Sequence, residues 1–365
     1  MEKKRILVAM SGGVDSSAVC LMLRERGYEV TGMTMRVWDL PGQFSDSEAE
    51  PDFVRSAREL ADRLDMQHIV VDARKEFRQG VVRYFVDEYR AGRTPNPCVV
   101  CNRDFKFRLL REWADRLDCP FMATGHYVNT EMLSGQPFLL MGDDARKDQS
   151  YFLWRVPQST LARCVFPLGG MEKAQVRQYL ADRGFTLRAR QSESMEICFV
   201  EGDYRDFLRQ ERPELAKEVD GGRFVDTTGR PLGTHRGVPF YTVGQRKGLG
   251  IALGEPAYVL RLNAAKNTIV LGREADLRVS AFFAEDAVVA DEAQLFAPSG
   301  TAVRIRYHSR PVACRAERLP DGRLLVRTDE PVSAVTPGQS AVFYAGRRLV
   351  GGAVIAAQTG IGAWL

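Results

Sequence analysis

The sequence lacks several features that would assign it quickly to a class. None of its apolar runs, over 365 residues, reaches the roughly 18 residues that a membrane-spanning helix needs. The short apolar run at 6–10 is followed at once by a glycine loop, so we expect a first β-strand there rather than a signal peptide. These absences predict a cytoplasmic protein without a membrane partner.

Dense cysteine pairing and a strong charge of one sign are also missing. Seven cysteines, an odd number spread over a long chain, do not suit the disulfide framework of a small secreted protein. The net charge is only +4, and its positive surplus falls within residues 206–365. That surplus permits a polyanionic partner, although a merely uneven surface explains it equally well.

The first part of the chain alternates strand-like and helix-like patterns. Such alternation predicts a parallel sheet with helices on both faces. The expected strands are 5–10, 28–38, 68–72 and 121–123, and the expected helices are 16–26, 51–64, 75–89 and 105–117.

Beyond residues 221–222 the pattern changes to short alternating runs bounded by Gly, Pro, Asp and Asn, which favours β-barrels or small sandwiches. These runs are 258–262, 268–271, 302–308, 314–319, 324–329 and 340–345. We therefore predict an α/β fold in three domains: a parallel-sheet catalytic domain (1–205), a central β-rich domain (206–278) and a C-terminal β-barrel (279–365).

A glycine-containing loop, Ser-Gly-Gly-Val-Asp-Ser-Ser at 11–17, follows the first strand and precedes a helix. Glycines allow close backbone approach, and a helix N-terminus favours an anion. The loop lacks the Gly-Lys-Ser/Thr of a Walker A motif and the spacing of a dinucleotide fingerprint. It resembles the PP-loop of ATP pyrophosphatases, which implies adenylation of a substrate oxygen; a strand–turn–helix with a serine cap is the plain alternative.

Two cysteine segments complete the informative motifs. Cys98 and Cys101 form a C-x-x-C pair, which suits a redox dithiol, half of a metal site, or one nucleophile with a neighbour. Structural zinc is disfavoured because no second such pair exists. Cys198 follows the polar residues 192–196, which are typical of a loop that carries a reactive group, although a buried core cysteine is an equal reading. We interpret Cys20, Cys119, Cys164 and Cys314 as core or surface fillers.

Taken in order, these motifs resemble one family, the tRNA uridine 2-thiolases, called MnmA in bacteria and TrmU in mitochondria. The segments that carry the resemblance span nearly the whole chain and form a highly specific set. They are 9–17, 92–107, 123–127, 147–153, 196–208, 241–251, 306–307 and 337–339.

The resemblance implies roles for particular residues. Cys101 would be the nucleophile and Cys198 the persulfide carrier. The residues expected to bind ATP are Ala9, Met10, Ser11, Gly12, Gly13, Val14, Asp15, Ser16, Met35 and Gly125. Asn96, Pro97 and Cys98 would line the target-base pocket. The residues expected to contact tRNA are His126, Lys147, Asp148, Gln149, Arg306, Tyr307 and Gln339.

The family's usual mechanism begins with ATP and Mg²⁺, and Asp15 is expected to help place the metal or a phosphate. A persulfide on Cys198 then attacks C2 of the adenylated wobble uridine. The implied partners are a cysteine desulfurase or sulfur-carrier protein and the tRNAs for Lys, Glu and Gln. Because thiolates are needed, we expect nearby positive charge to depress the thiol pKa values, with Arg103 and Lys106 as candidates.

The chain departs from many family members at Cys98, where they have Asp. A thiol, whose ordinary pKa is about 8.5, is a poor substitute for a carboxylate in acid–base chemistry. The change also gives three thiols, Cys98, Cys101 and Cys198, that could ligate a four-iron iron–sulfur cluster. The persulfide route is preferred and the cluster is its alternative.

Two further functions stay open on the sequence alone. One is a different PP-loop enzyme, such as an amidating synthetase or a lysidine-type tRNA ligase. The other is a non-catalytic RNA-binding or iron–sulfur carrier protein that retains the loop. The two key cysteines and the basic β-rich second half favour the thiolase.

Overall fold

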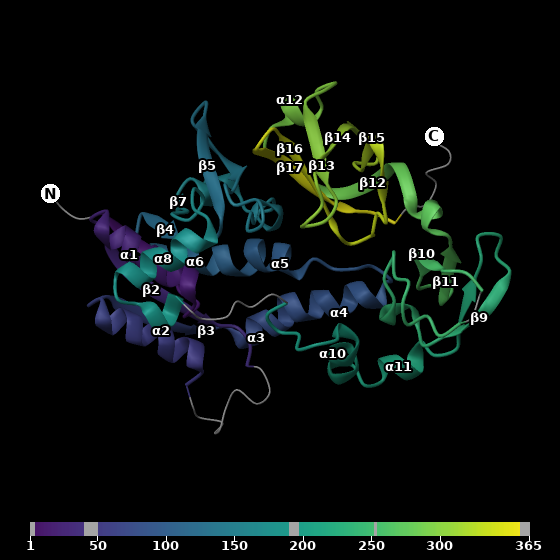
Figure 1. Ribbon diagram of the computed structural model, residues 1–365, viewed down its shortest axis with the longest axis horizontal. Coiled ribbons are helices and arrows are strands. Elements are labelled where there is room, and N and C mark those ends of the chain that lie inside the picture. Colours follow the sequence, from purple (N-terminus) through teal and green to yellow (C-terminus); the bar gives the residue numbers. More distant parts are fainter. Residues whose placement is uncertain (1–3, 40–49, 190–196, 252–253, 358–365) are drawn as a thin grey trace. The chain divides into compact units, whose positions relative to one another are not determined.

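The computed structural model describes residues 4–39, 50–189, 197–251 and 254–357. The chain forms two compact units, each assembled from separate stretches of sequence (Figure 1). The first unit holds 1–80, 98–199 and 347–349, and the second holds 81–97, 200–346 and 350–365. In the described ranges no helix is long and apolar enough to cross a membrane.

A five-stranded parallel sheet forms the centre of the first unit. Its strand order is β3-β2-β1-β4-β7, and every neighbouring pair is parallel. The strands are β1 (Arg5–Ala9), β2 (Glu29–Arg36), β3 (Gln67–Asp72), β4 (Phe121–Ala123) and β7 (Cys164–Val165). The predicted parallel sheet is thereby confirmed.

Helices bury the sheet because strand side chains alternate between its faces. Ile6 and Val8 of β1 join a core with α1 (Val14–Glu25), α2 (Asp52–Arg63) and α8 (Lys173–Asp182). Leu7 lies between them in sequence and is fully buried outside that core. The helix α6 (Phe107–Arg116) also packs against β1.

The helix predicted at 105–117 begins earlier than its sequence suggested. The chain turns helical in α5 (Pro97–Val100), continues through a π-helix, η2 (Cys101–Lys106), and only then enters α6. A proline is well tolerated in the first turn of a helix, so Pro97 starts this run rather than preventing it. The helix predicted at 75–89 is confirmed as α3 (Arg74–Phe77), a π-helix η1 (Arg78–Val82) and α4 (Arg83–Arg90).

Smaller elements of the first unit were not predicted. The strands β5 (Val128–Leu133) and β6 (Gln136–Met141) form an antiparallel hairpin after β4. The other short elements are η3 (Ser150–Phe152), α7 (Gln158–Leu161) and α9 (Thr186–Ala189). The loop expected at 192–196 lies outside the described residues.

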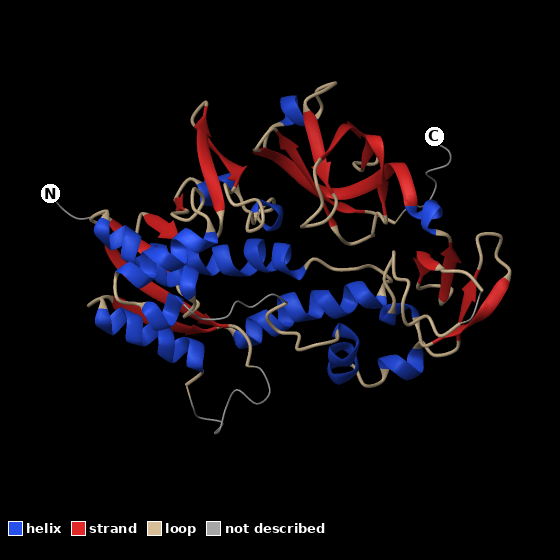
Figure 2. Cartoon of the chain, viewed as in Figure 1, coloured by secondary structure: helices blue, strands red, loops and turns tan. Residues whose placement is uncertain are grey.

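The second unit is rich in strands, as Figure 2 shows in red. One sheet has the order β10-β11-β8-β9, and a second closes on itself because β12 pairs with both β15 and β17. Its six strands confirm the predicted C-terminal barrel: β12 (Arg278–Val289), β13 (Thr301–Arg304), β14 (Val312–Arg318), β15 (Leu324–Ser333), β16 (Ser340–Ala345) and β17 (Arg348–Ile355).

The smaller sheet and a few short helices complete the second unit. Its strands are β8 (Gly222–Val225), β9 (Pro231–His235), β10 (Tyr258–Asn263) and β11 (Thr268–Gly272). The short helices are α10 (Tyr204–Glu211), α11 (Leu215–Glu218), η4 (Val238–Phe240), η5 (Glu274–Leu277) and α12 (Glu292–Leu295). The division into three domains at 205 and 278 stays a prediction.

Candidate functional site

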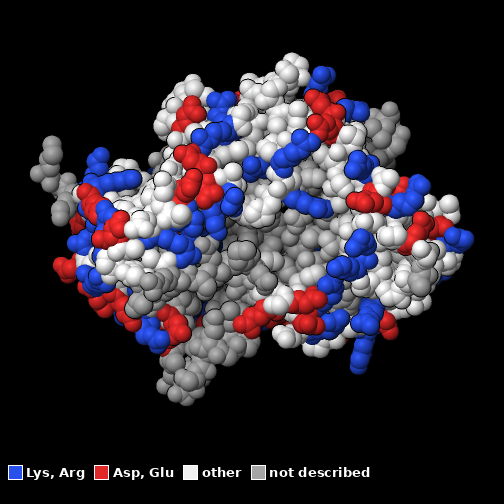
Figure 3. Space-filling model, in the orientation of Figure 1, with Lys and Arg blue, Asp and Glu red and all other residues white. Residues whose placement is uncertain are grey.

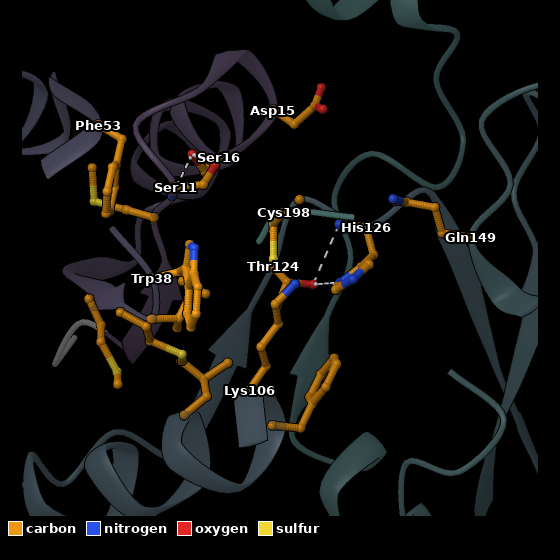
Figure 4. A pocket seen from close by; sticks show the side chains of 18 residues that line it. Ser11, Asp15, Ser16, Trp38, Phe53, Lys106, Thr124, His126, Gln149 and Cys198 are labelled. Atoms are coloured by element: carbon orange, nitrogen blue, oxygen red, sulfur yellow. Dashed lines mark hydrogen bonds between the residues drawn. The ribbon is translucent and has the colours of Figure 1, made fainter. Parts of the chain in front are cut away.

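A cavity of about 480 Å³ opens in the first unit at the carboxyl ends of β1, β2 and β4 (Figure 4). This volume is in the range of small-molecule sites, and the carboxyl end of a parallel sheet is where such sites form. Its lining includes seven of the residues predicted to bind ATP: Ala9, Met10, Ser11, Asp15, Ser16, Met35 and Gly125. Gly12, Gly13 and Val14 belong to the same loop without lining the cavity.

The phosphate loop, residues 11–17, owes its shape to glycine. Gly12 has a φ of +72°, and a Cβ there would lie 2.2 Å from the Phe53 carbonyl oxygen. Gly13 is the N-cap of α1, and no side chain caps that helix. The Ser17 hydroxyl donates to the Gly13 carbonyl oxygen at 2.8 Å. The free amide groups of the first turn are therefore available to an anion.

Gly125 is the second glycine that the site requires, because its backbone passes close to the phosphate loop. A Cβ at Gly125 would lie 3.0 Å from Cβ of Asp15 and 3.3 Å from the Ser16 amide nitrogen. Asp15 itself is held from the other side, because Lys173 Nζ contacts its two carboxylate oxygens at 2.7 and 2.8 Å. The Tyr127 hydroxyl also donates to Asp15, at 2.7 Å.

Arg188 holds the loop from behind. Its guanidinium donates to the Gly12 carbonyl oxygen at 3.4 Å, to the Ser56 hydroxyl at 2.9 Å and to the Ser56 carbonyl oxygen. The Ser56 hydroxyl in turn donates to the Gly12 carbonyl oxygen at 3.1 Å. These bonds fix the left-handed turn at Gly12 from α2 and α9.

Three thiols lie in the same part of the first unit and interact electrostatically, and we call them the thiol cluster: Cys98, Cys101 and Cys198. Cys198 lines the cavity and is exposed, whereas Cys101 is buried and Cys98 is half-buried. Negative charge on Cys198 raises the pKa of both other thiols, so the three interact. All three are free thiols.

An aromatic cluster positions Cys198. Its neighbour Phe199 is buried, with its ring centroid 6.0 Å from that of Trp38 and 5.5 Å from that of Phe77. Phe77 also contacts Phe105 of η2 edge to face, at 5.3 Å. Anchoring the next residue in this cluster leaves the Cys198 side chain at the cavity wall, near the helical turn that begins at Cys101.

The thiol pKa values differ in direction from the prediction. Burial raises the pKa of Cys101 to about 12 and raises that of Cys98. Cys198 is exposed at the cavity, but the surrounding protein still desolvates its thiol and raises its pKa. The positive charge of Lys106 acts to lower all three, but burial outweighs it. The expected net depression was therefore wrong for the resting protein, although Lys106 is a charged neighbour as expected. Arg103 instead pairs with Asp104, 3.1 Å away.

His126 lies in the cavity wall, where burial and the Lys106 charge lower its pKa to about 3. Its imidazole is therefore neutral at physiological pH. The Nδ1 atom and the Thr124 hydroxyl lie 2.7 Å apart, and Figure 4 shows this bond. Gln149 also lines the cavity, and its side-chain oxygen accepts from the Tyr127 amide at 3.0 Å.

Asp148 is the predicted tRNA contact that the structure places differently. Its side chain is 2% exposed, and its carboxylate accepts from the Gly142 amide and from the amide and hydroxyl of Ser150. The carboxylate shapes the turn between Lys147 and Gln149, and the contact of Asp148 with tRNA stays a prediction.

Lys147 lies in the first unit, and the other remaining predicted residues belong to the second. Gln339 donates to the carbonyl oxygens of Thr94 and Pro95, at 3.1 and 2.9 Å, and so braces the chain that leads to Asn96. Arg306 donates to the Ala334 carbonyl oxygen at 2.8 Å. The half-buried Tyr307 ring lies beside His308, whereas Asn96 is buried and Pro97 opens α5.

Sequence reasoning missed several residues of the site. Lys173 carries no local signal, because it reaches Asp15 only through the packing of α8 on α1. Trp38 and Phe53 line the cavity beside Met10 and Met35. Trp38 follows the carboxyl end of β2 and Phe53 lies in the first turn of α2. These positions are the sequence signal from which both residues could have been predicted.

Three family models match the chain in succession. Residues 4–202 match the tRNA methyl transferase HUP domain, 205–273 the tRNA methyl transferase PRC-barrel domain, and 281–355 the aminomethyltransferase beta-barrel domain.

The chain is similar over nearly its whole length to curated proteins that carry one name. A Bacteroides fragilis protein named tRNA-specific 2-thiouridylase MnmA 3 is 56% identical over 99% of this chain and 96% of its own. A Cytophaga hutchinsonii tRNA-specific 2-thiouridylase MnmA is 43% identical over 96% of this chain and 97% of its own. A Salinibacter ruber protein of that name is 42% identical, over 96% and 94%. The chain therefore belongs to the tRNA-specific 2-thiouridylase family.

Proposed function

We propose that the chain converts the wobble uridine of tRNA to 2-thiouridine at the expense of ATP. The observation that carries this proposal is that the Cys198 thiol and the phosphate loop hydroxyls of Ser11 and Ser16 line one cavity. An activated substrate oxygen and a sulfur nucleophile can therefore meet there. The proposal also accords with the name of the curated relatives.

ATP would bind with its phosphates on the loop and its base against the apolar wall. The amide groups at the start of α1 suit the phosphates. Met10, Met35 and Trp38 supply an apolar surface that suits a planar base. The uracil O2 attacks the α-phosphorus, the bond to pyrophosphate breaks, and an O2-adenylated uridine forms.

Mg²⁺ would neutralise phosphate charge, and it is typically held by one or two carboxylates together with substrate phosphates. Asp15 is a carboxylate in the cavity wall and fits that role. The protein side chains offer no complete metal site, since the described residues contain no group of three His, Cys, Asp or Glu that could hold an ion.

Sulfur transfer follows adenylation. A sulfane-sulfur donor loads the exposed Cys198 as a persulfide, whose terminal sulfur attacks C2 of the uridine. A carbon–sulfur bond forms, and the bond to the adenylate oxygen breaks as AMP departs with its electron pair. The Cys101 thiolate then attacks the Cys198 sulfur. This step releases 2-thiouridine and forms a Cys101–Cys198 disulfide. A thiol reductant then supplies two electrons and restores both cysteines to free thiols.

The iron–sulfur alternative is not favoured. A cluster on Cys98, Cys101 and Cys198 needs three thiolates arranged around one metal group. No such group of ligands occurs in the described parts of the chain, although all three thiols lie there. We derive no step through a cluster, and Cys98 keeps the proposed place in the target-base pocket.

We propose the tRNA contacts for each unit by itself. They are His126, Lys147, Asp148 and Gln149 in the first unit, and Arg306, Tyr307 and Gln339 in the second. On the face shown in Figure 3, basic and acidic side chains are interspersed. Charge on that face therefore does not by itself identify a tRNA surface, and the proposal rests on the family.

One assay tests the proposal. Purified protein is incubated with ATP, a wobble-uridine tRNA, a sulfane-sulfur donor and a thiol reductant, and AMP and 2-thiouridine are quantified together. We expect equal molar amounts of both, and neither without tRNA. If tRNA stimulates no AMP release, the proposal is wrong.

A further inference from the structure

Lys106 is a lysine in an unusual place. It is the last residue of η2 and lines the cavity together with Cys198 and His126. Its side chain is exposed to solvent, although the surrounding protein partly desolvates its ammonium group. Burial acts to lower the pKa of Lys106, but interaction with the ionised forms of Cys101, Cys198 and Cys98, in that order, raises it overall, and no carboxylate is among the groups that raise it.

The π-helix explains how one residue comes to serve the thiols. In an α-helix, side chains three or four positions apart share a face. A π-helix bonds residues five apart, so it brings Lys106 close to the face of Cys101, five positions earlier. Single π-turns of this kind are frequent at functional sites. An α-helical run would instead turn Lys106 away from Cys101.

We propose that Lys106 supplies the positive charge that balances anionic sulfur during the transfer, first on the Cys198 persulfide and then on the Cys101 thiolate. One ammonium balances one negative charge, so the two sulfurs are ionised in turn and not together. The inference rests on the proposed function. It adds Lys106 as the residue whose single positive charge allows the persulfide and the Cys101 thiolate to be ionised one after the other.

The other charged and titratable groups around the thiols do not offer this charge. His126 is neutral, because burial and the Lys106 charge itself hold its pKa near 3. Arg103, on the same π-helix, is exposed and pairs with Asp104. Within the described residues, Lys106 is the cation that acts to lower the pKa of each member of the thiol cluster.

The test measures thiol reactivity without ATP or tRNA, so it is independent of whether the protein thiolates tRNA. The rate of iodoacetamide alkylation at Cys198 is followed by peptide mass spectrometry between pH 6 and 10. In Lys106→Met we expect the alkylation midpoint to rise by about one pH unit, which lowers the rate at pH 8 about tenfold. Lys106→Arg should resemble the native protein.

Arg103→Met is the matched control, because it removes a cation from the same π-helix without touching the cavity. Its alkylation profile should match that of the native protein. A Lys106→Met profile that superimposes on the native one overturns the proposal, as does an equal shift in Arg103→Met. If Lys106→Met does not fold, Lys106→Gln carries the same test.

A second readout separates electrostatic stabilisation from a general loss of structure. In the complete assay, Lys106→Met should keep tRNA-dependent AMP release within about threefold and lose 2-thiouridine formation about tenfold or more. An equal loss of both would place Lys106 in the adenylation step and overturn the inference. If the native protein itself releases no AMP, the proposed function fails while the alkylation result still decides the role of Lys106.

Discussion

The phosphate loop and the thiol cluster serve one cavity but are built in different ways. The loop is a run of neighbouring residues whose shape depends on Gly12 and on hydrogen bonds within and behind it. The thiol cluster joins Cys101 on η2 with Cys198, which Phe199 anchors from a distant part of the chain. The loop positions a ligand by backbone geometry, whereas the cluster depends on burial and one cation.

This difference implies that the two half-reactions can be damaged separately. Changes at the loop should remove adenylation and everything after it, whereas changes at the thiols should leave adenylation intact. The predictions below test this difference, from the largest expected effect to the smallest, before the most direct test.

Gly12→Ala should have the largest effect. Its Cβ would overlap the Phe53 carbonyl oxygen, which is backbone and cannot move aside cheaply. We expect AMP release and thiolation to fall together by at least about a hundredfold, because roughly 2.7 kcal/mol of lost positioning is enough. Gly27→Ala is the control: its φ of +83° is also positive, but nothing lies within 4 Å, so only stability should decline. Unequal losses of AMP and 2-thiouridine in Gly12→Ala would contradict the prediction.

Cys101→Ala should stop the cycle after a single sulfur transfer. When the thiol reductant is omitted from the assay, AMP should appear in one burst and tRNA should remain attached to Cys198 through a disulfide, because no second protein thiol releases it, whereas the native protein releases its tRNA. A non-reducing gel would show this adduct, and dithiothreitol should dissolve it. Cys119→Ala, which removes a buried thiol of the same unit outside the cavity, should behave as the native protein. Undiminished turnover in Cys101→Ala would remove this thiol from the mechanism.

Lys173→Met should have an intermediate effect on the loop alone. Asp15 would lose the ammonium that holds both its oxygens, while the Tyr127 hydroxyl remains. We expect AMP release to fall about tenfold, which corresponds to about 1.4 kcal/mol. Cys198 alkylation should not change. A shift in alkylation would show that the loop and the thiol cluster are coupled.

The smallest effect concerns the pH dependence of His126. Its folded pKa, about 3, is below its usual 6.5, so it contributes stability above pH 6.5 that is lost as the pH falls toward 3. Titration of His126 should therefore not change the pH dependence of AMP release between pH 6 and 8. We expect this residue to alter the rate less than twofold over that range. An NMR titration of the imidazole checks this directly, and a midpoint near 6.5 would refute it.

Local patterns predicted much of the fold and the loop. The parallel sheet, the C-terminal barrel and the loop before α1 follow from strand periodicity and from glycine chemistry at 12 and 13. The π-helix at Cys101–Lys106 could not be predicted, because six residues are too few for their apolar spacing to distinguish a π-helix from an α-helix. The long strand β12 was also missed, since it begins where a domain boundary was expected.

The features of the site that the sequence did not predict depend on tertiary contacts between residues far apart in the chain. The link between Lys173 and Asp15 needs α8 to pack on α1. Thiol pKa values depend on enclosure, so the positive charge at Lys106 could be anticipated while the larger effect of burial could not. Asp148 shows the same limit, because its role as a buried acceptor appears only once the turn around it has formed.

The most direct test of the account is Cys198→Ala assayed for AMP and 2-thiouridine in the same reaction. The cavity serves both half-reactions but only the second uses this thiol. We therefore predict that tRNA-dependent AMP release persists while 2-thiouridine formation disappears. Undiminished 2-thiouridine formation in this variant would contradict the central claim that Cys198 delivers the sulfur.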